Sequence, residues 1–469
     1  MSPHPIPRWS RRAALARVAL GFGGLAAATL LATPPARAGE AAPGSPLAPR
    51  PPRFRPRARR VIFLFMHGGP SHVDTFDHKP LLVRDSGRPL PFAKPRVQFA
   101  QTGNLRRSPW DFRRHGDCGL WVSELFPNVG ACADELCVLK AVHGTNEAHG
   151  GALLKLHTGS ESQVRPSMGA WVSYGLGTEN ANLPSFVTIN PTLGHGGVAN
   201  WSNAFLPAIH QGTCIGGGVP VDQATIENLA PAWGPGVQRA QLDLLGDLQR
   251  EHLGLAGPDP ALAARIESFE LAFRMQSEAP SILSLEGEGE ATRRMYGLDD
   301  PRTASFARQC LLARRLSERG VRFVQVTHGY WDQHSDLTRD HARLASEVDQ
   351  PIAALLRDLR ARGLLDETLV LWGGEFGRTP TVQGTDGRDH HPHAFTMWMA
   401  GGGVRGGMTH GATDDYGFYP VEGAVHVHDL HATMLALMGL DHEQLTYRHA
   451  GRDFRLTDVS RDVVRRILA

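Results

Sequence analysis

The 469-residue sequence has few cysteines, little net charge and, after its N-terminus, no long apolar run. A formal net charge of +2 argues against a nucleic-acid-binding surface and against an acidic tail. No later segment has ~18 uninterrupted apolar residues, so we expect no stable membrane span once an N-terminal signal is removed. The content of 41% hydrophobic and 20% charged residues is ordinary for a globular protein.

The five cysteines show neither a CxxC pair nor a zinc-finger spacing. In an exported chain two or four of them are able to pair, and Cys118 with Cys132 or Cys137 is the nearest candidate. The sequence does not choose among the pairings, and one thiol must remain unpaired within a monomer.

The first 38 residues have the pattern of a twin-arginine export signal. Arg11 and Arg12 precede an apolar run rich in Ala, Leu and Gly, which ends at the A-x-A cleavage pattern of residues 36–38. The alternative is an N-terminal membrane anchor, which the short and Gly-rich run disfavours. We therefore expect export by the twin-arginine route, to the periplasm or the extracellular space.

The rest of the chain predicts one α/β domain. Residues 39–58 form a linker too rich in Pro and Arg for a packed element, and the domain covers 59–469. A helical pattern over about 238–295 indicates an insertion, and residues 340–363 predict a helix between two strands. We expect a mostly parallel central sheet with helices on both faces. Apolar runs predict its buried strands at 59–66, 135–142, 184–189, 321–327, 368–372 and 394–400.

Polar loops rich in His, Asp and Glu follow four of these strands. They read HGGPSHVDTFD, HGTNEAHGG, HGYWDQHSD and GGEFGRTP. In open parallel sheets ligands bind beyond the carboxyl ends of the strands, so one shared site is the economical interpretation. The segment GRDHHPH precedes strand 394–400, and we expect its side chains at the same end only if the loop doubles back.

Several side chains of these loops have the chemistry of metal ligands. Asp332 and His334 are two residues apart, so on an extended segment they point the same way. Carboxylate with imidazole suits Zn²⁺, Mn²⁺ or Fe, whereas Ca²⁺ and Mg²⁺ favour oxygen-only sets. Any single histidine here has the simpler interpretation of a hydrogen-bonded loop residue. The further candidate ligands are Glu375, Asp389, His390 and His393.

The loop after the first strand leaves alternatives open. Ser71 is a candidate nucleophile, although no G-x-S-x-G elbow surrounds it and a turn serine explains it equally. His67 and Asp74 are candidate metal ligands, or they fix the loop.

Six segments in this order resemble one family: HGGPSHVDTFDHKP, HGTNEAHGGALLKLHTG, HGYWDQHSD, LWGGEFGRTP, GRDHHPHAFTMWMAGGGVRGG and VHDLHATMLALMGLD. Over residues 59–469 they resemble the family named domain of unknown function 1501. That family looks like a branch of the alkaline phosphatase/sulfatase superfamily. The resemblance implies an alkaline phosphatase-like fold and hydrolysis of phosphate or sulfate esters at one or two divalent ions, with Zn, Mn, Fe and Ca not distinguished.

The resemblance also assigns residues. Asp332 and His334 match the superfamily's Asp/His pair, and Glu375 matches its acidic residue, although Phe376 stands where a histidine is usual. His390 or His393 matches its late histidine. No modifiable cysteine precedes GALLKLHTG, so Thr145 or a metal-bound water is the candidate nucleophile.

Two functions from different classes follow. The first is an exported metal-dependent hydrolase of an anionic small-molecule or glycan ester, in which His149 and Arg378 hold the anion or protonate the leaving group. The second is a non-catalytic protein of the same fold that binds metal or a glycan.

Overall fold

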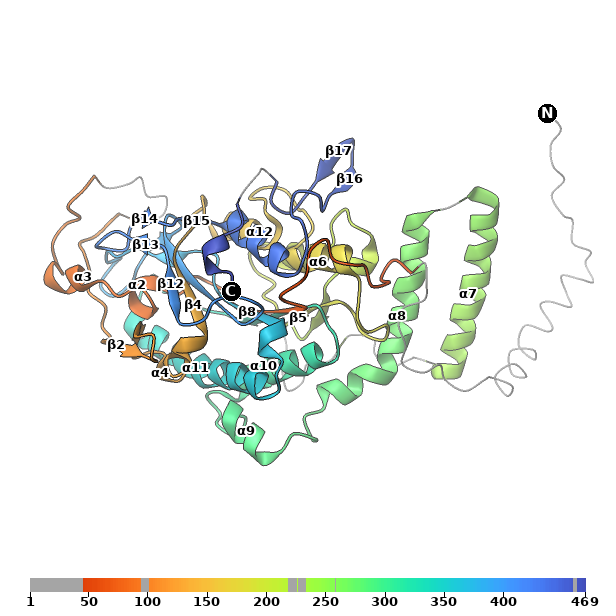
Figure 1. Ribbon diagram of the computed structural model, residues 1–469, viewed down its shortest axis with the longest axis horizontal. Coiled ribbons are helices and arrows are strands. Elements are labelled where there is room, and N and C mark those ends of the chain that lie inside the picture. Colours follow the sequence, from red (N-terminus) through yellow and green to blue (C-terminus); the bar gives the residue numbers. More distant parts are fainter. Residues whose placement is uncertain (1–44, 94–100, 218–225, 227–232, 258, 459–461) are drawn as a thin grey trace, which may run out of the picture.

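The computed structural model describes residues 45–93, 101–217, 226, 233–257, 259–458 and 462–469. Its centre is a nine-stranded sheet with the order β12-β4-β11-β8-β1-β7-β5-β6, in which β15 also pairs with β4 (Figure 1). The predicted signal over residues 1–38 lies outside the described residues. Strands of the sheet are β1 (Arg60–Met66), β4 (Leu136–His143), β5 (Phe186–Ile189), β6 (Thr213–Ile215), β7 (Phe323–His328), β8 (Thr368–Gly373), β11 (Phe395–Ala400), β12 (Met408–His410) and β15 (Val425–His426).

The six predicted strands and the mostly parallel sheet are confirmed. β1 lies between β7 and β8 and runs parallel to both, with Ile62 opposite Val324 and Val370. β11 is the exception, because it pairs antiparallel with β4 and with β8. The segment before β11 therefore lies at the carboxyl ends of the parallel strands directly. The expectation that this loop must double back is wrong, since it assumed a parallel strand.

Alternate side chains of β1 supply the two cores of the domain. Ile62, Leu64 and Met66 face the helices α10 (Ala304–Glu318) and α11 (Leu337–Ala361). Val61, Phe63 and Phe65 face the opposite layer, which contains α5 (His149–Thr158), α6 (Met168–Leu176) and α12 (Val427–Leu437). A strand that is apolar at every position is what a sheet covered on both faces requires. The predicted helices on both faces of the sheet are therefore confirmed. The predicted helix over 340–363 is also confirmed, as α11.

Helices fill the predicted insertion. They are α7 (Pro235–Ala256), α8 (Pro260–Leu283) and α9 (Glu290–Tyr296). Asp259 caps α8 by accepting from the backbone N–H groups of Ala261 and Leu262. In Figure 1, α7 and α8 lie beside the body of the domain, with α7 outermost. Among the residues of α7, Gly246 is the buried one.

Residues 50–59 lie along the body of the domain, although they form no helix or strand. The backbone N–H groups of Arg57 and Ala58 donate to the carbonyl of Leu437, and that of Phe54 donates to the carbonyl of Gly439. This part of the Pro/Arg-rich linker is therefore docked, contrary to the expectation of an unpacked segment. Proline lacks a backbone N–H and so prevents regular strand pairing, but the backbone N–H groups of the other residues still find hydrogen-bond partners.

The five cysteines, all within the described residues, form no disulfide, so the candidate pairing of Cys118 with Cys132 or Cys137 is not formed. Cys118 is exposed, whereas Cys132 and Cys137 are buried. Within the described part of the chain, no helix has the length and apolarity that a bilayer crossing needs.

Short elements lie outside the central sheet and its covering helices. The remaining α-helices are α2 (His72–Thr75), α3 (Pro80–Arg84) and α4 (Pro127–Gly130). The remaining strands form four two-stranded pairs, which are β2 (Phe112–His115) with β3 (Leu120–Ser123), β9 (Gly377–Arg378) with β10 (His390–His391), β13 (Ala412–Thr413) with β14 (Pro420–Glu422), and β16 (Tyr447–His449) with β17 (Arg452–Phe454).

Candidate metal centre

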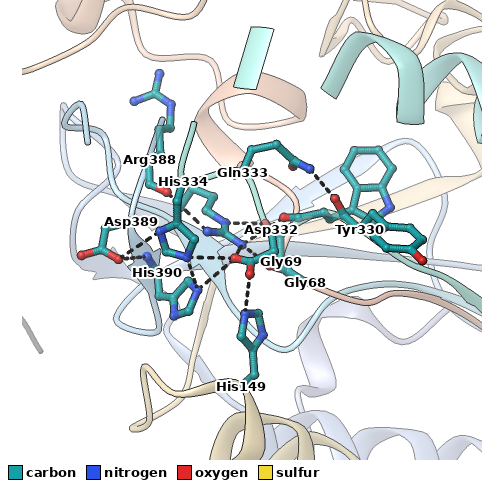
Figure 2. A network of polar contacts seen from close by, with 12 residues as sticks. Gly68, Gly69, His149, Tyr330, Asp332, Gln333, His334, Arg388, Asp389 and His390 are labelled. Carbon is teal, nitrogen blue, oxygen red and sulfur yellow. Dashed lines mark hydrogen bonds and ion pairs between the residues drawn. The ribbon is translucent and has the colours of Figure 1, made fainter. Parts of the chain in front are cut away.

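The candidate site lies where the central strands end. His67 follows β1, Asp332 and His334 follow β7, and Glu375 follows β8. The short β9–β10 hairpin between β8 and β11 brings His390 to the same place. Figure 2 shows Asp332, His334 and His390 converging, with His149 reaching Asp332 from another side.

Three ligand atoms form a nearly equilateral triangle. Nε2 of His334 and Nε2 of His390 lie 2.9 Å apart. Oδ1 of Asp332 lies 3.0 Å from the first nitrogen and 3.1 Å from the second. Ligand atoms ~2.05 Å from a Zn²⁺ ion are about 2.9 Å apart at right angles and about 3.3 Å apart at tetrahedral angles. The triangle therefore has the size of three donor positions around one divalent cation.

The histidines of the triangle are oriented by partners on their other ring nitrogens. Nδ1 of His390 lies 2.6 Å from the carbonyl oxygen of Glu147, and Nδ1 of His334 lies 2.5 Å from Oε1 of Gln383. Metal-binding histidines usually have such a partner, which fixes the tautomer and the orientation of the ring toward the ion. Asp389 is also near, with Oδ1 3.7 Å from Nδ1 of His334. His334, Asp389 and His390 form a further group whose ligand atoms lie within 4.8 Å of one another.

His149 lies between two carboxylates. Its Nδ1 is 2.7 Å from Oε1 of Glu375, and its Nε2 is 3.2 Å from Oδ2 of Asp332. Burial disfavours the protonated ring, but the hydrogen bonds and charges of the two carboxylates outweigh burial and raise the pKa of His149 to about 9. In the absence of an ion the ring is therefore positively charged at neutral pH.

Glu375 is buried behind His149. Its carboxylate accepts hydrogen bonds from the backbone N–H of Gly68 at 3.0 and 3.1 Å. Burial alone would raise the pKa of Glu375, but the hydrogen bond from His149 and the nearby imidazoles lower it below its usual value. Among the described residues, the groups of potential ligands do not include Glu375. Its contacts are those of a residue that orients His149.

Asp332 contacts three histidines and one arginine. Burial disfavours its charged form, yet hydrogen bonds with His149, His334 and His390 and the charge of Arg378 hold its pKa far below its usual range. Its side chain is 39% exposed, so it reaches the solvent side of the site. The carboxylate is therefore ionised at neutral pH, as a metal ligand must be.

Arg378 is fully buried, and its donors are used within the protein. Its guanidinium donates to Oδ1 of Asp332 at 2.7 Å and to carbonyl oxygens of Gly68, Gly69 and Trp331. We expected Arg378 to hold a substrate anion or to protonate a leaving group. Its burial and its contacts place it behind Asp332, where it joins the loops after β1 and β7.

A cleft of about 630 Å³ opens beside the triangle. His67, His149 and Asp332 form one part of its wall, and the loop after β5 forms another. That loop contributes His195, whose ring stacks on His149 with centroids 4.8 Å apart. Ligand atoms of His67, His149 and His195 lie within 4.8 Å of one another, so these three imidazoles form a second potential cation position.

His195 is the residue that the sequence analysis missed. It follows the predicted strand 184–189 in the segment PTLGHGG, so the rule that ligands lie at strand ends applied to it as well. Its backbone has a φ of 49°, and glycines flank it on both sides. The sequence signal for His195 was therefore present, in a strand-end loop that was not among the four predicted to form the site.

The structure leaves four predicted residues outside the cluster. Ser71 is buried and donates to Oδ2 of Asp74 at 2.5 Å. Asp74 pairs with the buried Arg388 at 2.7 Å, and this ion pair outweighs burial and lowers the pKa of Asp74. Thr145 is exposed and hydrogen bonds to Glu161. His393 packs among the aromatic rings of His391, Phe418 and Tyr419. These contacts fix loops, and they do not bring the four residues to the triangle.

A family model described as protein of unknown function (DUF1501) matches residues 58–468. The chain belongs to the DUF1501 family. A comparison with curated proteins finds no match. Among solved structures, two show limited similarity to the DUF1501 chain. One is the PsFucS1 sulfatase from Pseudoalteromonas sp., at 11% identity and a TM-score of 0.34, covering 82% of this chain and 68% of that one. Another is a protein in the alkaline phosphatase superfamily from Vibrio parahaemolyticus, at 10% identity and a TM-score of 0.33, covering 89% and 74%.

Proposed function

We propose that this protein is an exported, metal-dependent hydrolase of phosphate or sulfate esters. The observation that carries the proposal is the triangle of Asp332 Oδ1, His334 Nε2 and His390 Nε2, with edges of 2.9–3.1 Å, beside an open cleft. Carboxylate and imidazole together suit Zn²⁺, Mn²⁺ or Fe. The signal over residues 1–38 and the single domain over 59–469 belong to the same proposal.

A divalent cation bound here would polarise an ester oxygen and make a nucleophile of bound water at neutral pH. The protein's own residues would do the rest. His149, positively charged and facing the cleft, would attract an anionic ester and hold a proton for the leaving group. Glu375 keeps the ring of His149 in place through Nδ1, and Arg378 keeps the carboxylate of Asp332 in place.

The group of His67, His149 and His195 would hold a second cation. Asp332 lies between the two positions, because Oδ1 faces His334 and His390 while Oδ2 faces His149. A carboxylate placed in this way is able to bridge two ions, as in two-metal sites that clamp a phosphoryl group. In this state His149 would be a ligand, with Glu375 as the partner of its other nitrogen.

One observation favours the alternative, a non-catalytic protein that binds metal or a glycan. Neither Ser71 nor Thr145 is brought to the triangle, so the described residues offer no clear side-chain nucleophile. A hydrolase of this kind would have to use water.

The test is metal analysis of the purified protein, followed by assays with an aryl phosphate, a phosphodiester and an aryl sulfate. We expect up to two equivalents of Zn, Mn or Fe and turnover of at least one ester class that is lost on chelation. The variant His195→Ala should bind one equivalent fewer, with the exposed His252→Ala as its control. Stoichiometric metal without any turnover would favour the binding protein, and absence of metal would overturn the hydrolase and leave only the glycan-binding alternative.

A further inference from the structure

A second concave site lies at the opposite ends of the central strands, where β1, β7 and β8 begin. Its volume is about 430 Å³, within the range of small-molecule sites. Arg59, Arg322 and Glu367 in its wall come directly before or near the starts of β1, β7 and β8. A strand of seven residues at about 3.3 Å each spans roughly 20 Å, so this pocket is remote from the metal centre.

The wall of this arginine pocket is strongly basic. Its charged side chains are five arginines and two glutamates, namely Arg50, Arg55, Arg57, Arg59, Arg322, Glu179 and Glu367. The docked segment 50–59 supplies four of the arginines, and its backbone hydrogen bonds fix that side of the wall. The basic lining is therefore part of the folded domain.

The two glutamates are already shared among several guanidinium groups. Glu179 lies 2.8 Å from Arg59, 3.3 Å from Arg60 and 2.8 Å from Arg322. Glu367 lies 3.7 Å from Arg59 and 3.8 Å from Arg60. Within the described part of the chain, this leaves Arg55 and Arg57 without a carboxylate partner.

Arg322 is a buried member of the same positively charged wall. It is 8% exposed, and its Nε has no hydrogen-bond partner among the described residues. Burial lowers the pKa of Arg322, the charge of Glu179 opposes this, and repulsion from Arg59 and Arg60 adds to the lowering. A buried cation with cationic neighbours is stabilised when an anion binds beside it.

We propose that this arginine pocket binds a small oxyanion of two negative charges, either inorganic phosphate or the phosphate group of a monoester. Guanidinium groups match the oxygens of such anions with paired, charge-assisted hydrogen bonds. The site is separate from the ester hydrolysis proposed above, and its occupation does not depend on metal.

The first experiment titrates metal-free protein with inorganic phosphate at constant ionic strength and follows binding by calorimetry. We expect saturable binding at one site and no comparable signal with chloride. The double variant R55A/R57A should bind roughly tenfold more weakly or worse, since it loses two guanidinium groups that would donate charge-assisted hydrogen bonds to the anion. Both residues are exposed, so the variant should fold. Arg53→Ala, an exposed arginine of the same segment that does not line the pocket, is the matched control.

A second experiment distinguishes binding at this pocket from binding at the metal centre, and it distinguishes inorganic phosphate from a phosphate monoester. Asp332→Ala should leave phosphate binding unchanged. Phenylphosphonate, an analogue of a monoester that is not hydrolysed, should compete with phosphate if the pocket accepts an ester, and inorganic phosphate alone should bind if it does not. Equal affinity of wild-type and R55A/R57A protein, or loss of binding in Asp332→Ala, would overturn the proposal.

Discussion

Nδ1 of His149 lies 2.7 Å from Oε1 of the buried Glu375, which makes one ring nitrogen a donor to a fixed carboxylate and turns the other toward Asp332. The relationship joins the start of α5 to the loop after β8, 226 residues later. Glu375 therefore acts on the site indirectly, by orienting the imidazole of His149.

The first prediction concerns Asp332. Asp332→Ala removes one corner of the triangle and the negative charge that holds three histidines and Arg378 together, so we expect loss of bound metal and of ester turnover. Elemental analysis and a hydrolysis assay measure the two effects. Asp247→Ala, at an exposed aspartate of α7, should change neither. Full metal content in Asp332→Ala protein would contradict the ligand assignment.

The second concerns Thr145. Because Thr145 is exposed and bonded to Glu161, we expect Thr145→Ala to keep its metal and to change turnover by less than about threefold. A loss of turnover by several orders of magnitude, with metal retained, would instead identify the hydroxyl as a nucleophile, since a covalent role is worth more than the ~10²–10⁴ of a general acid. Single-turnover kinetics with an aryl ester distinguish these outcomes.

The third concerns proton release on metal binding. The pKa of His149 is about 9 without an ion, so below pH 9 a cation that uses its Nε2 must displace a proton. The affinity for Zn²⁺ should therefore rise up to tenfold per pH unit between pH 7 and 9 and level off above pH 9. His149→Gln should release about one proton fewer, which calorimetry in two buffers of different ionisation enthalpy measures. An unchanged proton count would exclude His149 as a ligand.

The fourth concerns acid stability. Burial of His157 lowers its pKa to about 3 from 6.5, so the unfolded chain binds more protons between these values and stability falls as the pH falls through them. His157→Leu, with an apolar side chain of similar volume, should lower the slope of the unfolding free energy against pH by up to ~1.4 kcal/mol per unit between pH 6 and 4. Urea unfolding at several pH values gives the slope. The exposed His252→Leu should leave it unchanged.

Much of this architecture was predictable from the sequence, because apolar runs of five to eight residues mark strands covered on both faces, and polar loops after them mark one edge of a parallel sheet. The direction of β11 was not predictable in this way. A strand that is buried at every position has no pattern that tells its direction, and only the pairing of β11 with β4 and β8 reveals that it is antiparallel.

The roles of individual polar residues were harder to predict. Asp74 and Asp332 both follow strands in loops rich in histidine, yet Asp74 is neutralised by Arg388, which lies 314 residues away. Arg378 is two residues beyond Phe376 and has the chemistry of an anion ligand, but carbonyl oxygens from two other loops surround it. Such pairings depend on loop packing, for which local sequence carries no periodic signal.

The antiparallel course of β11 has a practical consequence. β8 and β11 are neighbours in the sheet, so the chain from Gly374 to Ala394 leaves and rejoins the framework at adjacent points of one edge. This stretch, which carries Glu375, Arg378 and His390, thus lies between two adjacent strands, while Arg378 ties it to the loops after β1 and β7 and Glu375 ties it to α5. A change in its sequence would leave the strand spacing intact and alter the proposed cation site, which makes this stretch the place to engineer the preference for one cation over another.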